Sequence, residues 1–263
     1  MFLRKDATRH QLIRVDELIR ETIIYAKIAI GNAAYAFLIG GKLRMSINYI
    51  ISILKPMLEG AQMTILLFII AILVSIPLGF LLTLAVRSQI KPLSWLAQAY
   101  IYAMRGTPLL LQLLFICFGL PMIPVIGEYL VLDRFVAACL GFILNYAAYF
   151  AEIFRGGLLA IDKGQYEASQ VLGLNKWQMT TRIIMPQMFR IALPAVANES
   201  VTLVKDTALL YAVAVPELLH FAETAVNRDF TIVPFVVAGV IYLLMTLVLT
   251  LVFKWVENRF RFE

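Results

Sequence analysis

Five polar or charged side chains interrupt one apolar run, and their spacing places them together. The run over residues 191–213 reads IALPAVANESVTLVKDTALLYAV and contains Asn198, Glu199, Thr202, Lys205 and Asp206. At about 100° per helical residue, all five fall on a stripe roughly 120° wide, and the opposite side is almost wholly apolar. Carboxylates, an amide and a hydroxyl arranged in this way can bind the ammonium and other polar groups of a small molecule.

It is unfavourable for such a stripe to face lipid, because placing a charged side chain at the bilayer centre costs about 2.5–3.5 kcal/mol of free energy. We therefore expect it to face the protein interior or a water-filled path. In one hypothesis Asn198, Glu199 and Thr202 line a substrate pathway, and Glu199 takes an ammonium or a basic side chain. In the alternative, Glu199, Lys205 and Asp206 neutralise one another, or charges of a partner subunit, to hold the helix in place. For Lys205 and Asp206 the structural role is favoured, because adjacent opposite charges near a helix end readily serve it.

The sequence offers little for catalysis or metal binding. The 2 histidines are far apart, and the 2 cysteines, Cys117 and Cys139, lie in apolar runs as small hydrophobic residues. An intramembrane enzyme would need paired catalytic groups at matching depth, but Glu199 and Asp206 are seven residues apart on one predicted helix. We therefore predict neither an enzyme nor a metal or other cofactor in this chain.

The polar stripe must be positioned by membrane-spanning helices. The chain of 263 residues is 61% hydrophobic and 15% charged, whereas soluble domains carry about 25% charged residues. Long apolar runs predict an all-α integral membrane protein with five core spans. They are expected at about 60–86, 108–120, 135–154, 191–213 and 232–255. A further helix over 95–106 is expected to lie low in the bilayer before the second span.

The distribution of Lys and Arg predicts the topology. Basic residues follow the first, third and fifth spans, whereas the segment 119–133 has none and the segment after the fourth span has only Arg228. Cytoplasmic segments carry the excess of positive charge, so the loop over about 155–190 and the C-terminus are expected in the cytoplasm. The net charge of +6 then reports membrane topology, and no nucleic-acid partner is predicted.

The first 55 residues are predicted as an N-terminal extension, separate from a transmembrane domain over 56–263. Residues 22–41 are apolar enough for a sixth span, with Lys27 reaching the interface. The alternative is an amphipathic helix on the membrane surface, since Leu12, Val15 and Ile19 share one helical face. The residues leave these two interpretations open.

The loop over 155–190 contains a patterned segment, GQYEASQVLGLNKWQMTTRIIMP. We expect a first helix over 167–171, a turn at Gly173, and a second helix that Pro186 ends. The pattern Glu-Ala-Ala, three residues, Gly, nine residues, Ile-x-Leu-Pro stands here as Glu167-Ala168-Ser169, Gly173 and Ile183-Ile184-Met185-Pro186. Ser169 and Met185 are mild departures from it.

This motif resembles that of the transmembrane subunits of binding-protein-dependent ABC importers. The runs RGTPLLLQLLF and YAAYFAEIFRGGLLAIDKGQYEAS are similar to the branch that imports polar amino acids, and the resemblance covers about 56–261. It implies the five-helix core of a type I importer and a coupling helix seated in a groove of a separate ATPase. Glu167, Ala168, Gly173 and Pro186 are its expected coupling residues.

The resemblance also implies a set of partners. They are ABC ATPase subunits, an extracytoplasmic substrate-binding protein, and a second permease subunit that is either an identical chain or a homologue. The sequence contains no GxxxxGK[ST] phosphate-binding loop, so ATP is expected on the partner subunit. A self-contained channel or secondary transporter is the alternative, but such proteins usually show repeated halves and more spans.

Three further charged residues lie near predicted span ends. Glu152 and Arg155 are three residues apart on one helical face and are expected to orient the start of the coupling loop. Arg105 either forms part of a cytoplasmic gate or anchors to lipid phosphate. The identity of the transported amino acid stays open, with basic, acidic and amide side chains and cystine all compatible.

Overall fold

The computed structural model describes residues 47–260, which form helices and connecting turns and contain no strand. The segment 22–41, for which a span and a surface helix were both considered, lies outside the described residues. The first described helix, α2 (Ile47–Val86), runs without interruption across residue 56, where the transmembrane domain was expected to begin. It also starts well before the predicted span at 60–86.

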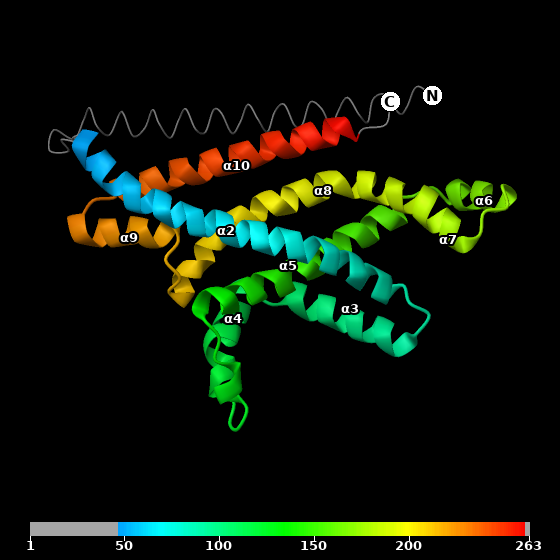
Figure 1. Ribbon diagram of the computed structural model, residues 1–263, viewed down its shortest axis with the longest axis horizontal. Coiled ribbons are helices and arrows are strands. Elements are labelled where there is room, and N and C mark those ends of the chain that lie inside the picture. Colours follow the sequence, from blue (N-terminus) through cyan, green and yellow to red (C-terminus); the bar gives the residue numbers. More distant parts are fainter. Residues whose placement is uncertain (1–46, 261–263) are drawn as a thin grey trace.

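Three single helices are long and apolar enough to cross a membrane, namely α2, α5 (Arg134–Leu159) and α10 (Val233–Arg259). Two helix pairs that bend at a short break also qualify, which brings the described residues to as many as five spans. Figure 1 shows α2, α5 and α10 running along the long axis of the molecule. The predicted all-α membrane fold is confirmed.

The first bent pair differs from the prediction for the second span. Helix α3 (Lys91–Gly106) ends at Thr107, and the chain continues through α4 (Leu109–Leu114), η1 (Phe115–Gly119) and η2 (Leu120–Met122) at 106° to it. Helix α3 packs along α2 and α5, and its Tyr100 hydroxyl donates to the Leu144 carbonyl at 2.6 Å. The segment expected to lie low in the bilayer is therefore part of the helix bundle. A turn, η3 (Gly127–Leu130), leads on to α5.

The second bent pair forms the fourth span. It winds continuously through α7 (Lys176–Gln178), η4 (Met179–Ile184), α8 (Met185–Asp206) and η5 (Thr207–Val213), and α9 (Leu218–Asp229) follows at 55°. The prediction that Pro186 ends a helix is wrong, because Pro186 lies in the first turn of α8. The wider π-helical turn of η4 precedes it, so the missing N–H of proline is tolerated there.

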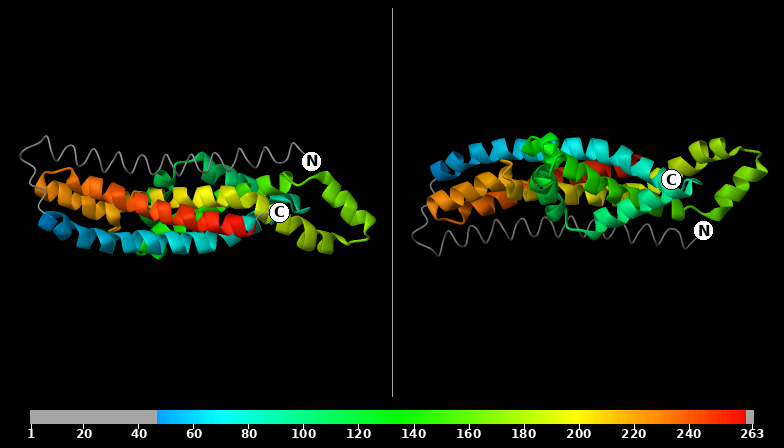
Figure 2. Two further views of the ribbon diagram at one scale, coloured as in Figure 1. Left: turned by 90° about the horizontal axis from the view of Figure 1, so that it is seen from above. Right: turned by 90° about the horizontal axis from the view of Figure 1, so that it is seen from below.

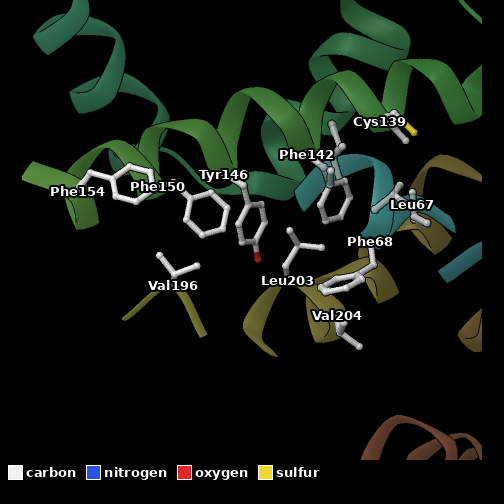
Figure 3. Close-up of a cluster of buried hydrophobic side chains, with 14 of the residues drawn as sticks. Leu67, Phe68, Cys139, Phe142, Tyr146, Phe150, Phe154, Val196, Leu203 and Val204 are labelled. Atoms are coloured by element: carbon white, nitrogen blue, oxygen red, sulfur yellow. The ribbon is translucent and has the colours of Figure 1, made fainter. Parts of the chain in front are cut away.

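Close contacts between α5 and its neighbours build the core. The aromatic side chains of Phe142, Tyr146, Phe150 and Phe154 point from α5 towards α8 and α2, where they meet Leu203 and other aliphatic groups (Figure 3). A Cβ atom at Gly79 of α2 would lie 2.7 Å from the Phe150 Cβ atom and 2.8 Å from the Ala147 carbonyl oxygen. Only glycine allows this approach of the α2 and α5 backbones.

The two ends of the bundle differ. Helix α6 (Lys163–Val171) and α7 project beyond one end, and the C-terminal end of α10 lies at that same end (Figures 1 and 2). Helix α9 and the start of α2 occupy the opposite end. The loop between α5 and α8 and the end of α10 thus share one side of the molecule, as the distribution of basic residues predicts.

Candidate functional site

A cavity of about 520 Å³ opens where α3 breaks into α4, beside α5 and α8. Residues from all three regions line it, namely Arg105–Leu109, Asn145, Tyr146, Tyr149, Glu199, Thr202 and Asp206. Its volume falls within the range of about 300–1,000 Å³ that small-molecule sites occupy. The break between α3 and α4 lies at this cavity, and Thr107 and Pro108 line it.

Helix α8 contributes three of its predicted polar residues to this cavity. Glu199 and Thr202 lie one turn apart, and Asp206 follows one turn later. Among the described residues, none donates a hydrogen bond to the Glu199 carboxylate. Asp206 instead accepts a hydrogen bond of 2.7 Å from the Tyr146 hydroxyl of α5. Both carboxylate oxygens of Glu199 are therefore available to a bound cation, whereas one oxygen of Asp206 is already occupied.

The other two members of the predicted stripe do not line the cavity. Asn198 and Lys205 are exposed on the adjoining part of the α8 surface. Within residues 47–260, no ion pair joins Lys205 to Glu199 or Asp206. The geometry thus divides the stripe into a cavity side and an outer side.

Arg105 supplies positive charge at the cavity. Its guanidinium carbon lies 5.4 Å from the centroid of the Tyr149 ring, and one of its nitrogens is 3.8 Å from the Glu152 carboxylate. Glu152 also accepts a hydrogen bond of 2.9 Å from Arg155 Nε. Glu152 thus connects a residue of the cavity with Arg155 near the end of α5, although neither Glu152 nor Arg155 lines the cavity itself.

Two amides that sequence reasoning missed hold the α3–α4 break. Gln112 Nε2 donates to the Met104 carbonyl at 2.9 Å and to the Thr107 hydroxyl at 2.7 Å. Asn145 of α5 donates to the same Met104 carbonyl at 3.1 Å and to Gln112 Oε1 at 2.9 Å. These bonds use carbonyl groups that the end of α3 leaves free. The signal in the sequence was a lone amide within each of two apolar runs.

The projecting α6–α7 unit has well-defined local structure. The Asp162 side chain caps α6 by accepting from the Gly164 amide at 2.6 Å, and Gly173 takes the left-handed conformation at φ 71°. Helix α6 is longer than the predicted 167–171. Ser169, which stands where the motif has alanine, is buried and bonds within α6 to the Gln165 carbonyl. A small side chain is needed here, because this side of α6 packs against η4.

The tip of this unit carries exposed apolar side chains. Val171 is 88% exposed, and Leu172 and Trp177 are each 76% exposed. Glu167 and Ala168 are exposed on α6, whereas Pro186 lies farther back at the start of α8. Apolar side chains on a helical hairpin that projects beyond the bundle form a surface suited to burial against another protein.

Comparisons with known proteins identify the family of this chain. Residues 75–262 match the family model described as "Binding-protein-dependent transport system inner membrane component". The arginine transport system permease protein ArtQ of Bacillus subtilis is 36% identical over 78% of this chain and 92% of its own length. The L-cystine permease protein TcyB of the same organism is 36% identical over 78% of this chain and 86% of its own.

Solved structures show the same fold. A crystal structure of an amino acid ABC transporter with histidines superposes with a TM-score of 0.75 at 29% identity, and covers 82% of this chain and 100% of the other. An inward-facing methionine ABC transporter matches with a TM-score of 0.61 at 17% identity, over 83% of this chain and 100% of the other, which supports the fold alone. The chain therefore belongs to the binding-protein-dependent transport system inner membrane components, the membrane permease subunits of ABC importers.

Proposed function

We propose that this chain is the permease subunit of an ATP-driven importer that moves polar amino acids across the bacterial cytoplasmic membrane. Its relatives are named for arginine and cystine transport, and others for glutamine and for glutamate and aspartate. The substrates in these names are all α-amino acids, which carry an ammonium and a carboxylate group. The cavity beside α8 presents groups of both complementary charges.

Glu199 is the proposed contact for the substrate ammonium, with Thr202 as an adjacent hydrogen-bonding group. Arg105 is the proposed partner for the substrate carboxylate, at the opposite wall of the same cavity. Asn198 is exposed beside Glu199 and stays a candidate for substrate contact on the outer side of α8. Asp206 and Lys205 are proposed to have a structural role and not to bind substrate. Asp206 already accepts a hydrogen bond from Tyr146.

The projecting α6–α7 unit is the proposed coupling element, in which Glu167 to Pro186 dock into a separate ATPase subunit. Val171, Leu172 and Trp177 would be buried in its groove, and the exposed Glu167 would meet polar or basic groups at the rim. ATP is bound and hydrolysed by that partner. Closure of two ATPases would then move α8 and with it one wall of the cavity.

The proposed orientation places the coupling unit and the C-terminus in the cytoplasm. Arg87 and Lys91 at the α2–α3 turn, Lys163 and Lys176 in the coupling unit, and Lys254 near the end of α10 gather at this end of the bundle (Figure 1). This concentration of positive charge is typical of the cytoplasmic side. A substrate-binding protein would then dock at the opposite end.

A second permease subunit, identical or homologous, is proposed to complete the pathway. The cavity lies open at the surface of α3 and α8, where Arg105 and Asn198 are exposed. A transported polar molecule at this depth must be shielded from lipid, so another protein surface has to cover the opening. Lipid would contact the outer faces of α2 and α10.

The observation that carries the proposal is the apolar tip of the α6–α7 unit on a chain of this family. The test is co-purification of the ATPase with a Leu172→Asp, Trp177→Asp double variant. A charged group in the groove should abolish recovery of the ATPase. The matched control is Phe230→Asp, which changes a 94% exposed apolar residue at the opposite end of the bundle. Equal ATPase recovery with both variants would refute the coupling role.

A further inference from the structure

A fully buried carboxyl group lies at the bend of the fourth span, away from the proposed pathway. Glu217 is 0% exposed and immediately precedes α9. Its Oε1 atom accepts a hydrogen bond of 2.8 Å from the His220 backbone amide, which caps the helix. Burial of a carboxyl group in a membrane bundle is costly unless donors satisfy it, so this position calls for a specific explanation.

The second oxygen of Glu217 binds a different helix. The Tyr242 hydroxyl of α10 donates to Glu217 Oε2 at 2.8 Å. Tyr242 packs against both large hydrophobic clusters of the bundle, and the buried hydroxyls of Thr64 and Thr207 interact with its phenol. The Glu217–Tyr242 pair thus lies where α2, η5, α9 and α10 meet.

The backbone conformation at the bend is unfavourable by itself. Ala214 takes a left-handed conformation with φ 55°, which costs a residue with a side chain roughly 1–2 kcal/mol. Surrounding contacts must hold that conformation. Helix α2 provides one of them, since a Cβ atom at Gly60 would lie 2.8 Å from the backbone carbonyl carbon and oxygen of Glu217.

Residues on the two sides of the bend form hydrogen bonds with different helices. Asp206, the last residue of α8, accepts from Tyr146 of α5 at 2.7 Å, and Glu217 before α9 accepts from Tyr242 of α10. The segment between these two bonds contains η5 and Ala214. Helix α10 packs along both α8 and α9, so the bond from Tyr242 ties the start of α9 to a helix that contacts both sides of the bend.

We propose that Glu217 is a positioning residue for transport. Through its bond to Tyr242 it fixes the angle between α8 and α9, and so the position of Asp206 and Glu199 at the cavity. The role depends on geometry and not on charge, because a glutamine in its place can accept from His220 N–H and donate to the Tyr242 oxygen. A measurement of transport tests this role only if the proposed function holds, whereas a measurement of the distance between α8 and α9 does not depend on the proposed function.

The test measures the α8–α9 geometry with spin labels on the full-length chain. Labels are placed at the exposed positions Ala195→Cys and Asn227→Cys after Cys117 and Cys139 have been replaced by alanine. Tyr242→Phe should broaden the distance distribution, and Glu217→Gln should keep the parental width. The matched control is Tyr100→Phe, which also removes a hydroxyl that donates to a neighbouring helix, but far from the bend.

In vesicles containing the complete importer, Tyr242→Phe should lower import per ATP hydrolysed about tenfold and raise KM for the amino acid, because Glu199 is no longer held in place at the cavity. A merely structural role would reduce the amount of folded complex and leave that ratio unchanged. Should Tyr242→Phe not fold, Glu217→Asp, whose shorter side chain withdraws from Tyr242, should show the same broadening. A Tyr242→Phe distribution as narrow as that of Tyr100→Phe, or a Glu217→Gln variant that behaves like Tyr242→Phe, would overturn the proposal.

Discussion

Replacing Glu199 with glutamine tests the proposed substrate contact with little change of shape. The carboxylate accepts no hydrogen bond from the described residues and faces a cavity of about 520 Å³. The substrate ammonium would therefore be its main partner. A hydrogen bond to a charged group contributes about 1.5–3 kcal/mol, and each 1.4 kcal/mol corresponds to a factor of about ten. Glu199→Gln should raise KM for import by roughly 10- to 150-fold.

The assay measures uptake of radiolabelled arginine, glutamine, glutamate and cystine by vesicles with the assembled importer, and takes KM and maximal rate for whichever is imported. Glu128→Gln makes the same chemical change at an exposed residue of η3, outside the cavity, and should leave KM unchanged. If Glu199→Gln assembles normally and imports with the parental KM and rate, the carboxylate does not bind substrate and the reasoning fails.

Three further changes test other parts of the structure. Gly79→Leu should prevent the approach of α2 to Phe150 and lower the melting temperature of the purified chain, because overpacking costs about 1–3 kcal/mol; an unchanged melting temperature would contradict the contact. Gln112→Leu should leave the Thr107 carbonyl and one Asn145 N–H without their partners and destabilise the fold by about 1–3 kcal/mol, whereas Gln98→Leu, at an exposed site on α3, should not; unfolding in denaturant distinguishes them. Gly173→Ala should weaken ATPase binding modestly in co-purification, since an L-residue at φ 71° costs about 1–2 kcal/mol although the site is open, and unaltered binding would show that the turn is not strained.

The sequence predicted the three spans that consist of a single helix, and it predicted the polar stripe. The apolar runs of α2, α5 and α10 are long, so their length alone distinguishes them. Helical spacing placed Glu199, Thr202 and Asp206 on one side, and that side lines the cavity. Spacing could not divide Asn198 and Lys205 from the other three, because the boundary depends on where α3 and α5 pack.

The bends and the buried polar contacts could not be predicted from the sequence. Proline at 186 indicated a helix end, but a π-helical turn accommodates it. The angle at Thr107 depends on amides from two separate segments, Gln112 and Asn145. Glu217 stands after Pro216 in a stretch with no helical pattern of its own, and glutamate is not among the strongly preferred capping residues, so neither its burial nor its partner Tyr242 could be inferred.

The unbroken winding from Lys176 to Val213 has a mechanical consequence. At about 1.5 Å per residue, the part from Lys176 to Asp206 is a rod about 45 Å long that joins the exposed hairpin tip to the floor of the cavity. A rod of this kind has no slack segment in which a displacement can be absorbed. A push on Trp177 along the axis of the rod would thus arrive at Asp206 as a movement of similar size.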